Sequence, residues 1–170
     1  MRQTILGLAV TAVIAAALVA PSSADALTSR AKYVHATGVC QPSTPLELGG
    51  LRFRPLGVFN NKSSAIYISC TLDTEFVADA GSTDIRIYFA NLSNVEQTVA
   101  CTAVGGRRGV VASSVSAETV ISADSLGSIS FVDVDRINES FTAYGISCLL
   151  PPKVEMGLIR MVEDDVGNGL

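Results

Sequence analysis

Short segments in which apolar and polar residues alternate recur along the chain, separated by turn-forming clusters about every ten residues. The clearest segment is 65–72, and others are 51–54, 84–90, 96–104, 128–133, 141–150 and 154–162. A period of two is typical of strands with one buried face. We therefore predict an all-β fold, an antiparallel β-sandwich of about eight or nine short strands.

Three segments carry more specific predictions. Pro55 follows 51–54, which favours a sheet edge or a strand end for this segment. Segment 110–122 is rich in Val and Ser but has no strong phase, so it fits one bent strand or two short ones. In 154–162 the alternation slips after Leu158, which predicts a β-bulge near Gly157.

The first 26 residues have the pattern of a secretory signal peptide. Arg2 supplies a positive charge, 5–20 is an uncharged stretch, and Ala24-Asp25-Ala26 matches a signal-peptidase site. The stretch is shorter than the roughly 20 residues that span a bilayer. We expect cleavage near Ala26, a single β domain over 27–170 with no transmembrane segment, and a periplasmic or secreted location.

Four cysteines in an exported chain indicate two disulfides. Their wide spacing argues against zinc sites and C-x-x-C redox chemistry. Three pairings are possible, and we favour Cys40 with Cys70 and Cys101 with Cys148 because sequential pairing closes shorter loops. Most of these cysteines lie on predicted inward faces, so we expect the bridges to join strands across the core.

Composition excludes some classes of protein and leaves one alternative fold. A net charge of −4 argues against nucleic-acid binding. A small outer-membrane barrel has a similar size, but its strands need about 9 to 11 residues and aromatic girdles. Aromatic residues make up only 6% of this chain, and several of its segments are shorter.

Arg107 and Arg108 stand between glycines in a predicted hairpin connection. A basic tip on an acidic protein can contact an anionic group, because glycine backbone leaves N–H groups open to oxyanions. Tyr67 and Tyr88 are predicted on outward strand faces. These four residues are the candidate binding residues.

We expect no catalytic residue, metal or cofactor. His35 is the only histidine, and the chain has no G-x-S-x-G motif. Asp133 and Asp135 are the candidate carboxylate pair for hydrolysis. Acidic residues near 73–84 and at 163–165 offer oxygen ligands for Ca²⁺ but lack an EF-hand pattern.

Segments 35–42, YISCTL around Cys70, Cys101 in its strand, and YGISCLLPP around Cys148 resemble a group of secreted, disulfide-bonded β proteins of Gram-negative bacteria. The resemblance covers most of 27–155 and implies export and a disulfide framework, with no catalytic residue. We expect a non-enzymatic domain that binds a protein, a glycan or the cell envelope through loops. A small secreted hydrolase or hydrolase inhibitor is the alternative.

Overall fold

The computed structural model describes residues 28–72, 82–106, 113–132 and 143–165. In chain order the elements are β1 (Thr28–His35), the helical turn α1 (Ala36–Val39), β2 (Cys40–Pro42), the 3-10 helix η1 (Pro45–Gly50), β3 (Leu51–Arg54), β4 (Gly57–Asn60), β5 (Ile66–Leu72), β6 (Ser82–Asn91), β7 (Gln97–Gly106), β8 (Ser113–Ile121), β9 (Leu126–Val132), β10 (Ala143–Leu150) and β11 (Val154–Asp165). None of the described helices is long and apolar enough to cross a bilayer. The predicted signal peptide lies outside the described residues.

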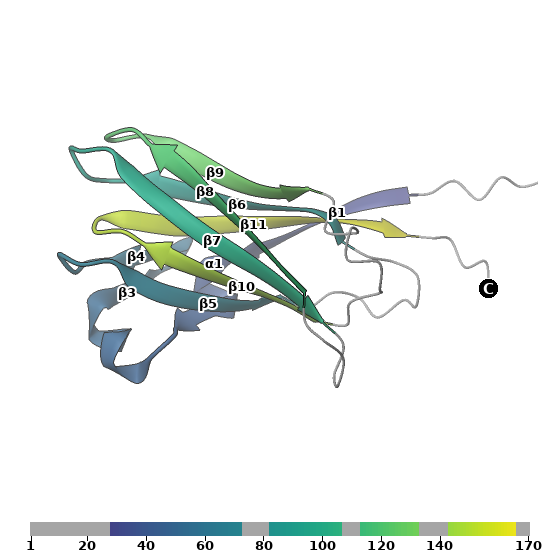
Figure 1. The fold of residues 1–170 in the computed structure, drawn as a ribbon, viewed down its shortest axis with the longest axis horizontal. Helices are drawn as coiled ribbons and strands as arrows, with labels where there is room; N and C mark the ends of the chain where they lie inside the picture. The colour runs from purple at the N-terminus through teal and green to yellow at the C-terminus, as the bar shows by residue number, and fades with distance from the viewer. Residues whose placement is uncertain (1–27, 73–81, 107–112, 133–142, 166–170) are drawn as a thin grey trace, which may run out of the picture.

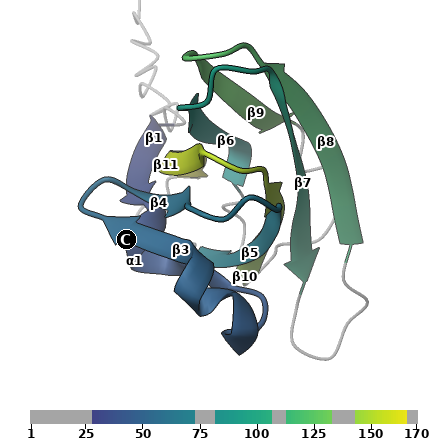
Figure 2. The same cartoon turned by 90° about the vertical axis from the view of Figure 1, so that its left-hand side faces the viewer.

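The strands form two antiparallel sheets (Figures 1 and 2). The six-stranded sheet has the order β3-β4-β11-β6-β9, and β1 pairs with β11 as well. The five-stranded sheet has the order β2-β5-β10-β7-β8. Each sheet has its own margins rather than closing on itself, so the predicted sandwich is confirmed.

The core consists of the inward faces of both sheets, where alternation in the sequence becomes alternation in burial. In β5 the buried side chains are Ile66, Ile68, Cys70 and Leu72, as predicted. In β6 they are Ile85, Ile87 and Phe89. Burying each such side chain contributes on the order of 1.5 to 3 kcal/mol, so these strands hold the two layers together.

The β-bulge predicted near Gly157 is present in β11. Met156 pairs with Phe89 and Ile159 with Ile87, so β11 has one more residue than β6 over this stretch. The bulge lets Met156 and Ile159 both face the core, while Leu158 is only partly buried. The predicted edge position of 51–54 is also confirmed, because β3 is a margin of the six-stranded sheet.

Two buried asparagines fix the connections that pass from one sheet to the other. Asn60 ends β4 and donates from Nδ2 to the carbonyls of Ser64 (2.9 Å) and Leu150 (2.8 Å). Asn91 ends β6 and donates to the carbonyls of Val95 (2.8 Å), Ile121 (3.0 Å) and Ser122 (3.0 Å). Each amide oxygen accepts the backbone N–H two residues further on. Both side chains therefore join the two sheets, and the β4–β5 and β6–β7 connections that they brace lie at the same end of the sandwich (Figure 1).

The chain contains two disulfides, Cys40–Cys70 and Cys101–Cys148. Each joins residues that face each other directly on neighbouring strands, β2 with β5 and β7 with β10. Both bridges therefore lie within the five-stranded sheet, and the expectation that they join strands across the core is wrong. Inward-facing cysteines alone do not distinguish the two arrangements, because neighbouring strands of one sheet also bring inward side chains together.

Candidate functional site

The candidate binding residues do not form one cluster. Tyr67 lies on the outer face of the five-stranded sheet and is 53% exposed, whereas Tyr88 lies on the outer face of the six-stranded sheet and is 36% exposed. The two rings are therefore on opposite sides of the sandwich and cannot contact one small ligand. Arg107 and Arg108 lie outside the described residues.

The residues considered for hydrolysis and for calcium binding form no site in the part of the chain that the structure describes. Asp133 and Asp135 lie outside the described residues, as do Asp73, Glu75 and Asp79. Within the described part of the chain, no group of three His, Cys, Asp or Glu side chains is placed to hold a metal ion. Asp84 pairs with Arg160 at 2.9 Å, and His35 is exposed at the end of β1.

Strand register gathers a set of side chains on the outer face of the five-stranded sheet. Ser147 of β10 faces Ser69 of β5 on one side and Thr102 of β7 on the other, and Thr102 faces Ser116 of β8. One step along each strand pair, Leu149 faces Tyr67 and Ala100, and Ala100 faces Glu118. The first row carries hydroxyl groups, and the second has an aromatic ring at one end and a carboxylate at the other.

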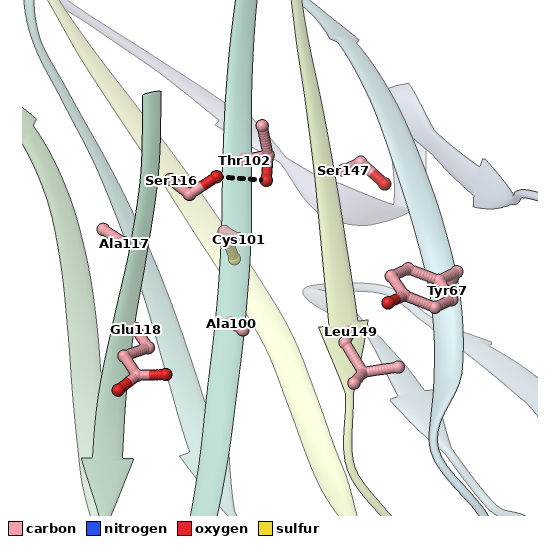
Figure 3. A pocket seen from close by; sticks show the side chains of 9 residues that line it. All are labelled: Tyr67, Ala100, Cys101, Thr102, Ser116, Ala117, Glu118, Ser147 and Leu149. Carbon is pink, nitrogen blue, oxygen red and sulfur yellow. Dashed lines mark hydrogen bonds between the residues drawn. The ribbon is translucent and has the colours of Figure 1, made fainter. Parts of the chain in front are cut away.

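A shallow hollow of about 340 Å³ lies over these two rows. It is lined by Tyr67, Ala100, Cys101, Thr102, Ser116, Ala117, Glu118, Ser147 and Leu149 (Figure 3). Small side chains form its floor, with Tyr67 on one side and Glu118 on the other (Figure 3). The hollow exists because Ser and Ala occupy the positions where larger residues would cover the sheet.

The polar groups of the hollow are already partly ordered. The hydroxyls of Thr102 and Ser116 share a hydrogen bond of 2.8 Å across β7 and β8 (Figure 3). Beyond the hollow, the hydroxyls of Ser43 and Ser69 are 3.0 Å apart, which continues the polar row toward β2. Each hydroxyl retains further donor or acceptor capacity. Such a surface can bind a ligand that both donates and accepts hydrogen bonds.

The charged side chains that line the hollow determine which charge a ligand can carry. Among the described residues that line the hollow, Glu118 is the one with a carboxyl group, and none is a lysine or an arginine. A carboxylate without a neighbouring cation repels anions and accepts hydrogen bonds from neutral donors. The hollow therefore suits a neutral, hydroxyl-bearing ligand.

Of the residues of this site, only Tyr67 was predicted from the sequence. Ser147, Thr102, Ser116 and Glu118 are outward residues of predicted strands, and outward Ser and Thr are ordinary on solvated sheets. Their grouping follows from the order and register of β5, β10, β7 and β8, which are not neighbours in sequence. An outward run of small and hydroxyl residues was the only available signal.

No protein-family model and no curated protein sequence matches the chain. Among solved structures, the Podospora anserina GH26-CBM35 β-(1,4)-mannanase aligns with a TM-score of 0.44 and 11% identity, over 78% of this chain and 27% of the mannanase chain. TmCBM61 in complex with β-1,4-galactotriose gives 0.36 and 9%, over 79% of this chain and 84% of that chain. A CBM4 structure gives 0.36 and 8%, over 79% and 86%. At these scores and identities the likenesses do not identify a ligand of this chain.

Proposed function

We propose that this protein is a non-catalytic binding domain that takes a neutral glycan in the hollow on the five-stranded sheet. The observation that carries the proposal is the combination of an exposed aromatic ring, three hydroxyl side chains and one carboxylate, with no cation among the lining residues that the structure describes. Sugars have hydroxyl groups around their edges and C–H groups on their faces. The two rows of the hollow offer partners for both.

Each lining group has a role in this proposal. The hydroxyls of Ser147, Thr102 and Ser116 donate to and accept from sugar hydroxyls. The Glu118 carboxylate accepts from sugar O–H groups, and bonds to a charged acceptor are stronger than neutral ones. The ring of Tyr67 provides a rigid apolar surface for a sugar face.

The size of the surface favours an oligosaccharide over a single sugar. A volume of about 340 Å³ is at the lower end of the range of roughly 300 to 1,000 Å³ for ligand pockets. The polar row continues from Ser116 through Ser69 to Gln41, which faces Ser69 on β2. Adjacent strands are about 4.8 Å apart, so a row across five strands spans about 19 Å. A short glycan chain would contact more of this row than one sugar.

The same residues argue for binding without hydrolysis. Glycoside hydrolysis uses two carboxyl groups about 5 to 10 Å apart, and the described lining residues contain one. None of these residues is a histidine, so the lining hydroxyls have no imidazole base.

The location forms part of the proposal. Two disulfides are expected of proteins in oxidising compartments, which supports export through residues 1–26 as a cleaved signal peptide. We also propose that the chain belongs to the group of secreted, disulfide-bonded β proteins of Gram-negative bacteria that it resembles in sequence. Export would place the hollow where envelope and extracellular glycans occur.

A glycan array followed by calorimetry on the best-bound oligosaccharide tests the proposal. Tyr67→Ala should weaken binding by about tenfold or more, because truncating an aromatic side chain that contacts the ligand commonly costs more than about 1.4 kcal/mol. Glu118→Gln should weaken it by a smaller factor. Tyr88→Ala is the matched control, since it removes a tyrosine from the opposite face, and should leave the affinity unchanged.

Any one of three results would contradict the proposal. The array could give no neutral glycan with measurable affinity, Tyr67→Ala could bind as well as the native chain, or Tyr88→Ala could lose binding equally. A bound glycan returned shorter after incubation would contradict the non-catalytic part. Unchanged far-UV circular dichroism of each variant would show that the fold is retained.

A further inference from the structure

Strand β8 forms a long margin of the five-stranded sheet, and no strand in the described part of the chain pairs with its outer side (Figure 2). It has nine residues, Ser113–Ile121, with no proline and with Glu118 as its one charged residue. Two valines are exposed on it, Val115 at 45% and Val120 at 57%. An edge strand with these properties is a template for pairing with another extended strand.

Most other described margins carry features that discourage such pairing. Strand β2 has three residues and ends at Pro42, and β3 has four residues, two of them arginines, followed by Pro55. Strand β1 contains Arg30 and Lys32. The remaining margin, β9, is shorter than β8 and contains Gly127, which weakens a strand. Short strands, prolines and charges are the usual protections of sheet edges, and β8 has the fewest of them.

The disulfides show which backbone groups of β8 point to the open side. In antiparallel pairs, facing Cα atoms are about 4.5 Å apart when the pair is not hydrogen-bonded and about 5.5 Å apart when it is. The Cα atoms of Cys101 and Cys148 are 4.1 Å apart, so this pair is not hydrogen-bonded. The N–H and C=O of Cys101 therefore point away from β10 and toward Ala117, which faces Cys101 on β8.

The direction of backbone groups alternates along a strand, so the neighbours of Ala117 point the other way. The open N–H and C=O groups of β8 are those of Ser114, Ser116, Glu118 and Val120. The opposite margin obeys the same rule. There Cys40 and Cys70 are a close pair with Cα atoms 3.9 Å apart, and three residues on, the N–H of Ser43 donates to the carbonyl of Tyr67 at 2.9 Å.

We propose that two copies of this chain pair through antiparallel β8 strands, with the two-fold axis at Ala117. In this register Ser116 faces Glu118 of the second copy, and Ser114 faces Val120 of the second copy. All four residues with open backbone groups then exchange hydrogen bonds with the other strand. A register centred on Glu118 would place two carboxylates opposite each other, which is unfavourable, and one centred on Ser116 leaves Val120 without a facing residue in β8.

The side chains of β8 fit the register centred on Ala117. The Ser116 hydroxyl can donate to the facing carboxylate, so each Glu118 gains a neutral partner. Ala117, the smallest side chain of the strand, lies at the axis, where facing residues are closest. Val115 faces Thr119, a pairing of β-branched residues that suits a sheet.

The paired sheets would be continuous, and both hollows would lie on the same face, on either side of the axis. The dimer does not depend on what the hollow binds. Its test measures mass and cross-linking, so it can fail while glycan binding succeeds, and the reverse.

The first test is sedimentation equilibrium of the purified chain with both disulfides intact, over a wide range of concentrations. We expect the mass to rise from one copy to two. In the double variant Ser114→Pro/Val120→Pro, each proline removes an N–H that points to the open side, so the ladder with β7 is kept. Its dimer dissociation constant should rise by about tenfold or more. The matched control Ser114→Ala/Val120→Ala keeps both N–H groups and should dimerise like the native chain.

The second test reports the register. Val115 and Thr119 of the second copy form a facing pair of the close, non-hydrogen-bonded kind, as the two native disulfides do. The double variant Val115→Cys/Thr119→Cys should therefore give a disulfide-linked dimer in a glutathione buffer. Each single variant should remain unlinked, because its cysteine faces a residue that is not a cysteine.

Four outcomes would overturn the dimer as proposed. In sedimentation, these are a single-copy mass at every concentration and an alanine control that fails to dimerise. A third is a proline variant that keeps its fold by circular dichroism and still dimerises like the native chain. In cross-linking, the fourth is single cysteine variants that cross-link as well as the double variant.

Discussion

Replacing Asn91 by alanine should remove a large part of the stability of this protein. The side chain is completely buried, its Nδ2 donates to three carbonyls, and its Oδ1 accepts from the N–H (3.0 Å) and hydroxyl (2.7 Å) of Ser93. Alanine removes all five bonds, and the loss at the Ser93 hydroxyl adds little because this hydroxyl keeps its bond to the carbonyl of Val95 (2.8 Å).

The magnitude follows from the number of bonds lost. A net loss of about 1 kcal/mol for each of three carbonyls and one N–H gives about 4 kcal/mol. Typical domains have a free energy of unfolding of about 5 to 15 kcal/mol, so the change is a substantial fraction of the total. Asn60→Ala loses three bonds and should cost about 3 kcal/mol.

Urea unfolding followed by far-UV circular dichroism measures this change, since the chain has no tryptophan for fluorescence. Asn94→Ala is the matched control, because Asn94 is exposed in the same connection, and it should change stability by less than about 0.5 kcal/mol. A loss below about 1 kcal/mol for Asn91→Ala would refute the reasoning, as would an equal loss in the control.

Three further changes test other parts of the structure by the same measurement. Replacing both Cys101 and Cys148 with alanine opens the covalent loop between them, whose ends are 47 residues apart in sequence. This change should lower the free energy of unfolding by about 4 kcal/mol. Gly57→Ala should cost about 1 to 3 kcal/mol because its new Cβ would lie 2.7 Å from a backbone carbonyl oxygen, whereas Gly145→Ala, with its nearest atom at 3.9 Å, should be nearly neutral. Arg54→Ala should cost about 1 kcal/mol because Arg54 makes both an ion pair (2.7 Å) and a contact with an aromatic ring (4.3 Å).

Each of these has an outcome that would count against it. Full stability after loss of the bridge would mean that the unfolded chain is not restrained by it. Equal effects at the two glycines would show that the close approach at Gly57 relaxes without cost. An Arg54→Lys variant as unstable as Arg54→Ala would show that the charge contributes nothing.

The strands that could be predicted from sequence are those with one buried and one solvated face. Strand β5 is the clearest case, because its neighbours bury every second residue. Strand β4 was missed, since all four of its residues are buried and no alternation remains. The weak phase of 110–122 also has a physical cause. As a margin of its sheet, β8 leaves residues exposed on both faces, and Ile121 is its one fully buried described residue.

The hollow depends on information that local patterns do not contain. Tyr67 and Ser147 are separated by 80 residues in sequence but lie on adjacent strands, and their grouping requires the strand order. The asparagines are similar. Asn60 begins a turn-forming cluster, 60–64, in the sequence, but its burial follows from contact with Leu150 on another strand. Local alternation therefore predicted the layers, and tertiary pairing produced the site.

The disulfides also have a consequence for how the chain is made. Each bridge joins a cysteine to the next one along the sequence, so the two covalent loops, 40–70 and 101–148, do not overlap. As the chain emerges from its N-terminus, Cys40 and Cys70 can pair before Cys101 appears. The remaining two cysteines then have only each other as partners. If the cysteines are oxidised in the order of their synthesis, the native bridges would form directly, without an isomerase to exchange wrong ones.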